Sequence, residues 1–184
     1  HLLRRQRQMC IRDRYLTCLI LGIITSFSLP PYNFVFLNFL SLPTLLYILI
    51  NYTHKKIISF FVGWVFGFGY FISNLYWITN SLTFDVNFKL IIPFALILIP
   101  LFLGIFYGLV TFLSSLFNLK NKLSSVLIFS IFFGGIEFLR SFILGGFPWN
   151  LLVFSVSNNL PSLQILSYVG LSLIHISEPT RRYF

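Results

Sequence analysis

Long, nearly uninterrupted apolar runs constrain the fold of this chain more than any other feature. Of its 184 residues, 57% are hydrophobic, 24 are phenylalanine and only 9% are charged. A soluble domain of ordinary composition has about a quarter charged residues. Apolar runs of about 17 or more residues recur, and as helices they are long enough to cross about 30 Å of hydrocarbon. The sequence therefore predicts an all-α fold, a polytopic bundle of transmembrane helices.

Polar or proline-containing breaks divide the apolar sequence into five largely complete spans and the start of a sixth. The breaks fall at 30–32, 51–56, 83–89 and 118–122, and the segment 145–159 is predicted to be irregular or re-entrant. Proline within a span, as at Pro43, is tolerated as a kink. The predicted spans are 15–29, 34–50, 57–81, 90–117 and 123–144, and the start of the sixth is 161–170.

The two ends of the chain do not read like natural protein sequence. Residues 4–14 read RRQRQMCIRDR and residues 171–182 read LSLIHISEPTRR. Both resemble translations of adapters used in transposase-based sequencing libraries, and a stretch of the DNA implied by one is the reverse complement of a stretch of the DNA implied by the other. Segments of such origin do not belong in fold reasoning. We therefore expect residues 1–14 and 171–184 to be artefacts without a consistent tertiary role, and 15–170 to be a natural transmembrane region truncated at both ends.

Excluding the two ends changes the charge. The whole chain has a formal net charge of +9, but six basic and two acidic side chains remain within 15–170, a net charge of +4. The basic N-terminus is then not a nucleic-acid-binding arm, and we expect no nucleic-acid partner. Cys18, alone in an apolar span, is predicted to be a small buried hydrophobic residue. With His54 the only remaining histidine, no metal site or disulfide is predicted.

The distribution of lysines predicts the orientation in the membrane. Four of the five loop lysines lie in the loops after the second and fourth spans, which fall on the same side if the spans alternate. Positively charged loops face the cytoplasm. The loops with Lys55 and Lys56, and with Lys120 and Lys122, are therefore predicted to be cytoplasmic, and the loop with Trp149 to be periplasmic.

Glu137 and Arg140 lie inside the fifth predicted span. A charge at such a position costs about 2.5–3.5 kcal/mol on insertion scales, so it requires a reason. The two residues are three apart, share one face of a helix and can pair. A structural ion pair is the favoured interpretation for Glu137. For Arg140, the structural ion pair and a second interpretation are equally favoured. In the second interpretation, the guanidinium extends to a phosphate above an outward-facing lipid cavity.

Phe147, Pro148 and Trp149 follow two glycines at the end of this span. A lone tryptophan there would be an interfacial anchor. The glycines and the proline instead force a compact turn, which favours a rigid apolar wall for an acyl chain. Two G-x-x-x-G spacings, Gly63/Gly67 and Gly104/Gly108, allow helices to approach closely, and packing within the bundle is favoured over dimerisation.

The order of elements in residues 137–155, E-F-L-R-x-x-x-L-x-G-F-P-W-x-x-x-x-x-S, resembles the membrane region of bacterial apolipoprotein N-acyltransferases. The stretch GWVFGFGYFISNLYWITNSL, from Gly63, is similar to the third span of the same family. The resemblance extends from 30–32 to 168–170. It implies an enzyme of the bacterial inner membrane that transfers an acyl chain from a phospholipid to the α-amino group of a lipoprotein diacylglyceryl-cysteine.

The resemblance also says what to expect of this chain's own residues. The family carries its Glu, Lys and nucleophilic Cys on a nitrilase-like α/β domain, which is absent from this sequence. We therefore expect no catalytic residue, no cofactor and no activity of the fragment alone, with a phospholipid donor, the apolipoprotein acceptor and membrane lipids as partners of the intact enzyme. The oligomeric state is not predicted. The candidate substrate- or lipid-binding residues are Trp149, Pro148, Phe147, Arg140 and Glu137.

A fragment of a polytopic transporter is the alternative. Transport would require polar or ionisable side chains along a path through several spans. Only Glu137 and Arg140 are embedded, and both belong to one span. The continuation of the gene would separate the two hypotheses, because an acyltransferase continues into a soluble α/β domain and a transporter into further spans.

Overall fold

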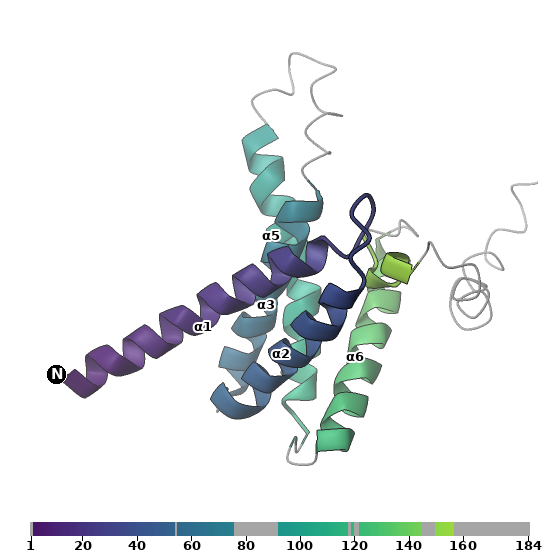
Figure 1. The fold of residues 1–184 in the computed structure, drawn as a ribbon. Coiled ribbons are helices and arrows are strands. Elements are labelled where there is room, and N and C mark those ends of the chain that lie inside the picture. The colour runs from purple at the N-terminus through teal and green to yellow at the C-terminus, as the bar shows by residue number, and fades with distance from the viewer. Residues whose placement is uncertain are drawn as a thin grey trace, which may run out of the picture.

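The computed structural model describes residues 2–53, 55–75, 92–117, 119, 122–144 and 150–156. Within these ranges it contains α-helices and one short 3-10 helix, and no strand, so the predicted all-α bundle is confirmed (Figure 1). The elements are α1 (Leu2–Ser26), α2 (Phe36–Tyr52), α3 (Lys56–Asn74), α5 (Ile92–Ser114), α6 (Lys122–Ile143) and η2 (Leu152–Val156).

Among the described residues, three helices are long and apolar enough to cross a membrane: Lys56–Asn74, Ile92–Ser114 and Leu123–Ile143, with mean hydropathies of 1.5, 2.5 and 1.9. They lie within the predicted spans apart from one residue at the start of α3. The shorter apolar helix α2 contains Pro43, as predicted, and α5 contains Pro100. Serine and threonine in these helices donate their hydroxyl protons to carbonyls three or four residues earlier, as Thr44 and Ser114 do. Such bonds satisfy polar groups that the bilayer cannot.

Two helix boundaries differ from the sequence-based expectation. Helix α3 ends at Asn74, and the N–H of Leu75 donates to the carbonyl of Phe71. The span was expected to reach residue 81, but 76–81 lie outside the residues that the structure describes. Helix α1 begins at Leu2 rather than at residue 15, because 2–14 contains no glycine or proline to interrupt a helix.

The N-terminal half of α1 extends beyond the other helices (Figure 1). At Arg14, the last residue of the expected artefact, the guanidinium donates a hydrogen bond to the carbonyl of Tyr52 and lies 5.8 Å from the centre of its ring. This is a tertiary contact in a segment for which none was expected. The adapter origin of residues 1–14 remains a prediction.

Helix α3 is the centre of the bundle. It packs most extensively against α5 and α1, while α6 packs on α5 and α2 on α1. Backbone approach at glycine determines the α3–α5 contact: a methyl group on Gly67 would lie 2.9 Å from the Cα of Gly104, and one on Gly108 would lie 2.9 Å from the ring of Phe60. The predicted use of both G-x-x-x-G spacings within the bundle is confirmed.

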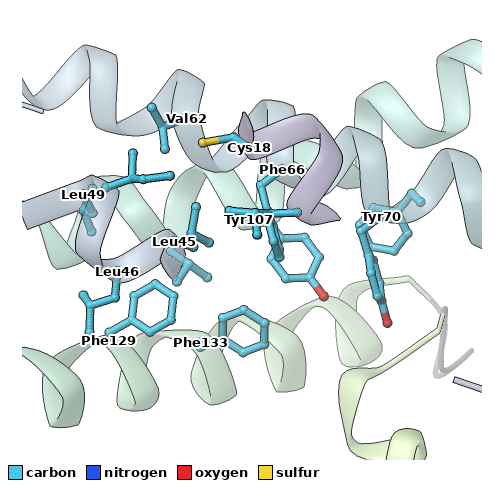
Figure 2. Close-up of a cluster of buried hydrophobic side chains, with 14 of the residues drawn as sticks. Cys18, Leu45, Leu46, Leu49, Val62, Phe66, Tyr70, Tyr107, Phe129 and Phe133 are labelled. Atoms are coloured by element: carbon cyan, nitrogen blue, oxygen red, sulfur yellow. The ribbon is translucent and has the colours of Figure 1, made fainter. Parts of the chain in front are cut away.

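The α1–α3 contact is equally close. A methyl group on Gly22 would collide with the backbone of Phe66, and one on Gly69 with the carbonyl of Leu19. Cys18 is fully buried beside this contact, as predicted, in the cluster that includes Phe66 and Val62 (Figure 2).

The helix directions bring polar segments to one end of the bundle. Ser26 at the end of α1, Asn74 at the end of α3 and Asn150 after α6 line one cavity, so we call this end the cavity end. The opposite end holds Lys55, which precedes α3, and the first turn of α6 at Lys122. We call it the lysine end.

Candidate functional site

Glu137 and Arg140 form the predicted ion pair in the last two turns of α6. The Nη2 atom of Arg140 lies 3.6 Å from the Oε1 atom of Glu137, and the two side chains are 1% and 13% exposed, respectively. Burial at this depth is costly for either charge alone, so each stabilises the other. The pair faces the inside of the bundle.

Glu137 also joins three elements. Its Oε1 atom accepts a hydrogen bond of 3.0 Å from the hydroxyl of Tyr107 on α5. The backbone N–H of Leu152, the first residue of η2, points at the same carboxylate, 3.1 Å from Oε1 and 3.3 Å from Oε2. Hydrogen bonds to a charged acceptor are the stronger kind. The carboxylate therefore fixes η2 to α5 and α6.

Arg140 lies against aromatic rings instead of extending to the surface. Its guanidinium carbon is 4.9 Å from the ring centre of Phe71 and 5.6 Å from that of Tyr107. Cations at such distances are attracted to the ring faces, most strongly where water is excluded. The extended conformation that would reach a phosphate is therefore not the one adopted here.

Tyr70 makes the second connection to the segment after α6. Its side chain is fully buried, and its hydroxyl donates a hydrogen bond of 2.8 Å to the backbone carbonyl of Asn150. Asn150 has a φ of 42°, a left-handed conformation that asparagine tolerates better than most residues. Figure 2 shows the hydroxyls of Tyr70 and Tyr107 directed toward α6 and the chain that follows it.

These contacts form one cluster, which we call the tyrosine–carboxylate cluster: Tyr70, Phe71, Tyr107, Glu137 and Arg140. Ring centres within it are 5.1–5.6 Å apart. Neither Tyr70 nor Tyr107 was predicted from the sequence to belong to a site. The available signal was a tyrosine inside an apolar span, because a buried hydroxyl requires a partner.

The cluster fixes the chain directly after the predicted lipid wall. Phe147, Pro148 and Trp149 lie outside the residues that the structure describes, so their role remains a prediction. The next residue, Asn150, is held by Tyr70, and Leu152 is held by Glu137. Residues 150–152 are thus attached to the bundle core by two hydrogen bonds.

A cavity of about 610 Å³ opens at the cavity end beside this attachment. Its size is within the usual range for small-molecule sites, about 300–1,000 Å³. The described part of its wall is neutral, with amide and hydroxyl groups interspersed among apolar side chains, and can therefore contact both polar and apolar parts of a ligand. The lining residues are Ser26, Phe27, Leu29, Pro30, Pro31, Tyr32, Ser73, Asn74, Asn150 and Phe154.

The sequence matches a known family over most of its length. Residues 21–176 match the family described as the apolipoprotein N-acyltransferase N-terminal domain. This chain belongs to that family. The matched range includes residues 171–176 of the C-terminal segment attributed above to an adapter, and the origin of that segment remains a prediction.

Curated members of the family have similar sequences. The apolipoprotein N-acyltransferases of Brucella melitensis and Rhizobium rhizogenes are 30% and 29% identical over 175 residues, covering 89% of this chain and 33% of each relative. That of Rhizobium etli is 31% identical over 167 residues, covering 84% of this chain and 31% of the relative. The chain thus spans about a third of the length of these apolipoprotein N-acyltransferases.

Proposed function

We propose that this chain is the membrane region of an enzyme that transfers an acyl chain from a phospholipid to the N-terminal diacylglyceryl-cysteine of lipoproteins. The observation that carries the proposal is the family match over residues 21–176, together with relatives that are each named apolipoprotein N-acyltransferase. The transporter alternative has less support, because the described charged residues inside α6 are paired with each other.

The cavity end is the part of the membrane region that we assign to the lipid substrate. Phe147, Pro148 and Trp149 would form an apolar wall along an acyl chain, beside the cavity lined by Asn150. The hydrogen bonds at Asn150 and Leu152 support this assignment, since a wall can orient a substrate only if its attachment is rigid.

Glu137 and Arg140 serve this site as positioning residues. Both lie against groups of the bundle itself, among them Tyr107, Leu152 and Phe71, and against each other. They would therefore act on the substrate through the turn that they hold, and a direct contact between Arg140 and a phosphate would require the guanidinium to leave its aromatic neighbours.

The reaction itself would take place on groups outside this chain. A nucleophilic cysteine would attack the phospholipid ester, form a thioester and release the lyso-lipid; the lipoprotein amine would then attack the thioester and regenerate the thiol. Cys18 is fully buried within α1 and cannot supply that thiol. We therefore propose that the catalytic residues belong to an extramembrane α/β domain and that this chain alone is inactive.

We further propose that the protein lies in the bacterial inner membrane with the lysine end in the cytoplasm and the cavity end in the periplasm. The arrangement of Lys55 and the start of α6 at one end of the bundle supports this orientation. In intact cells, a membrane-impermeant thiol reagent should fail to label His54→Cys or Asn121→Cys. Tyr32→Cys, at the cavity end and 55% exposed as tyrosine, should be labelled. The opposite pattern would reverse the topology.

The test of function is a chimera. Residues 21–170 of this chain would replace the matching region of the Brucella melitensis enzyme, and lipoprotein N-acylation would be measured by mass spectrometry. We expect acylation from the chimera and none from this chain alone. A chimera that inserts at normal abundance but does not acylate would contradict the proposal.

The same chimera tests the lipid wall. Trp149→Ala should lower turnover at normal abundance. The control is Trp64→Ala on α3, whose indole N–H donates 2.9 Å to the carbonyl of Leu101 on α5 and so contributes to helix packing. If both variants lose activity only in proportion to lost protein, Trp149 is a structural residue.

A further inference from the structure

An open apolar groove runs between α2 and α6. Its volume is about 860 Å³, and the two helices that border it belong to different parts of the bundle, since α2 packs on α1 and α6 packs on α5. The lining is apolar along most of its length, with amides at the two ends of its α2 side. The lining residues are Asn38, Phe39, Leu42, Pro43, Leu46, Tyr47, Ile50, Asn51, Leu119, Val126, Phe129, Ser130, Phe133 and Gly134.

Glycine marks the α6 wall of this groove. The glycines of α1, α3 and α5 each lie against a neighbouring helix, where an added methyl group would meet it within about 3 Å. By contrast, a methyl group on Gly134 or Gly135 of α6 would meet no atom of the described residues within 4 Å. Glycine inside a helix costs about 1 kcal/mol relative to alanine, and small residues four apart, such as Ser130 and Gly134, are typical of close helix contacts in lipid.

The chain itself leads to the mouth of this groove. Asn38, which lines the groove on α2, donates a hydrogen bond of 3.0 Å to the hydroxyl of Ser155 in η2. The described chain ends one residue later, at Val156. The apolar stretch 161–170 begins five residues after that, and five residues can reach about 17 Å. The start of this stretch can therefore reach the mouth of the groove.

We propose that the groove between α2 and α6 is the docking site of the apolar stretch that begins at Pro161, folded as a further helix. Leaving η2 at the cavity end, this helix would run antiparallel to α6 and parallel to α2. Over 161–170 it would be about 15 Å long, against about 20 Å for the α2 wall from Asn38 to Asn51.

Small residues on the two helices match in depth. Gly134 lies nine residues before the end of α6 at Ile143, and Gly170 lies nine residues after Pro161. At 1.5 Å per residue, both would lie about 13 Å from the cavity end. A close crossing of the two helices at this depth requires small residues on both.

Lipid acyl chains and a second copy of this chain are the two other possible occupants of the groove, and the experiment below distinguishes them from the proposed helix. Lipid acyl chains would fill an apolar groove without any need for glycine at Gly134. A second copy of this chain could use the same glycine, but the connection from Asn38 to Ser155 places this chain's own continuation nearer.

The experiment is cysteine cross-linking in the full chain, in membranes, with Cys10→Ser and Cys18→Ala as background. Gly134→Cys combined with Gly170→Cys should give an intramolecular cross-link with a short bifunctional thiol reagent, seen as a mobility shift that reductant reverses. Gly135→Cys with Gly170→Cys is the matched control. Gly135 is equally uncrowded but is not part of the groove lining, so its pair should give little product.

Three results would overturn the proposal. Absence of a cross-link from either pair at normal abundance would leave the groove to lipid. A dimer-sized product from Gly134→Cys alone would assign it to a second copy. Equal cross-linking of both pairs would show that the helix does not lie on the Gly134 face. None of these readouts requires acyl transfer, so the outcome is independent of the proposed function.

Discussion

The α3–α5 and α5–α6 contacts hold the same helix, α5, in two different ways. On the α3 side, the backbones approach at Gly67 and Gly104, and the contact is extensive. On the α6 side, the contact is smaller, and it contains the hydrogen bond from Tyr107 to Glu137 and the ring contact between Tyr107 and Phe133, whose centres are 5.2 Å apart.

The difference follows from the properties of the solvent. In lipid, apolar side chains gain little by leaving the bilayer for a helix interface, so association depends on dispersion contacts and on polar interactions. Glycine increases the dispersion contacts by bringing two backbones together. A buried carboxylate with several hydrogen-bond donors supplies the polar interactions, at the cost of placing a charge in the apolar interior of the membrane.

Tyr107 takes part in both contacts. Its backbone and ring lie against Gly63 and Gly67 of α3, and its hydroxyl reaches Glu137 of α6. A rigid contact on one side thus positions a hydrogen bond on the other. Close packing against α3 fixes the position of α5, and the tyrosine–carboxylate cluster then connects α5 to η2.

The largest effect should come from breaking the polar contact. Glu137→Leu removes the carboxylate that lies 3.6 Å from Arg140 and that accepts from Tyr107 and Leu152. Removing one partner of a buried pair destabilises by about 3–5 kcal/mol. The measurement is unfolding in mixed detergent micelles, followed by circular dichroism.

The control for this prediction is Glu137→Leu combined with Arg140→Met. Replacing both charges with apolar groups avoids a buried charge without its partner, and should recover most of the loss. If Glu137→Leu alone unfolds at the same denaturant concentration as the parent chain, the ion pair does not stabilise the α5–α6 contact.

A smaller loss should follow from breaking the close-packed contact. Gly67→Leu would force side-chain atoms into the space that the backbone of Gly104 and the ring of Tyr107 now occupy. Overpacking of this kind costs about 1–3 kcal/mol. Gly135→Leu is the matched control, because a methyl group there meets no described atom within 4 Å, and it should leave the unfolding midpoint unchanged or raise it. Equal loss in both variants would mean that backbone approach at Gly67 is not the cause of the loss.

Local features of these two contacts could be predicted from the sequence. The spacing of Gly63/Gly67 and Gly104/Gly108 indicated close approach, and the separation of Glu137 and Arg140 indicated pairing on one helix face. Both depend only on the 3.6-residue period of a helix and on the cost of polar groups in lipid.

Contacts between distant segments could not be predicted in this way. Nothing in the spacing indicated that Tyr107, 30 residues before Glu137, would donate to it, or that Tyr70, 80 residues before Asn150, would hold that turn. These pairs depend on how the helices cross, which the pattern of one helix does not specify. The open space at Gly134 is likewise a property of the assembled bundle.

The smallest effect on stability should come from Tyr70→Phe, and it is the most informative about function. The change removes one hydroxyl, which donates 2.8 Å to the carbonyl of Asn150, and keeps the ring that packs on Phe71 and Tyr107. Hydrogen bonds between groups within membrane bundles contribute about 0.6 kcal/mol on average. The fold should therefore survive with little loss, while the segment after Trp149 loses its attachment at Asn150. In the chimera described above, we expect a lower kcat at normal abundance.

Tyr47→Phe is the control, because Tyr47 lies on α2 with 57% of its surface exposed. This variant should change neither abundance nor turnover. If Tyr70→Phe acylates at the parent rate, the attachment at Asn150 does not position a substrate site, and the cluster serves stability alone.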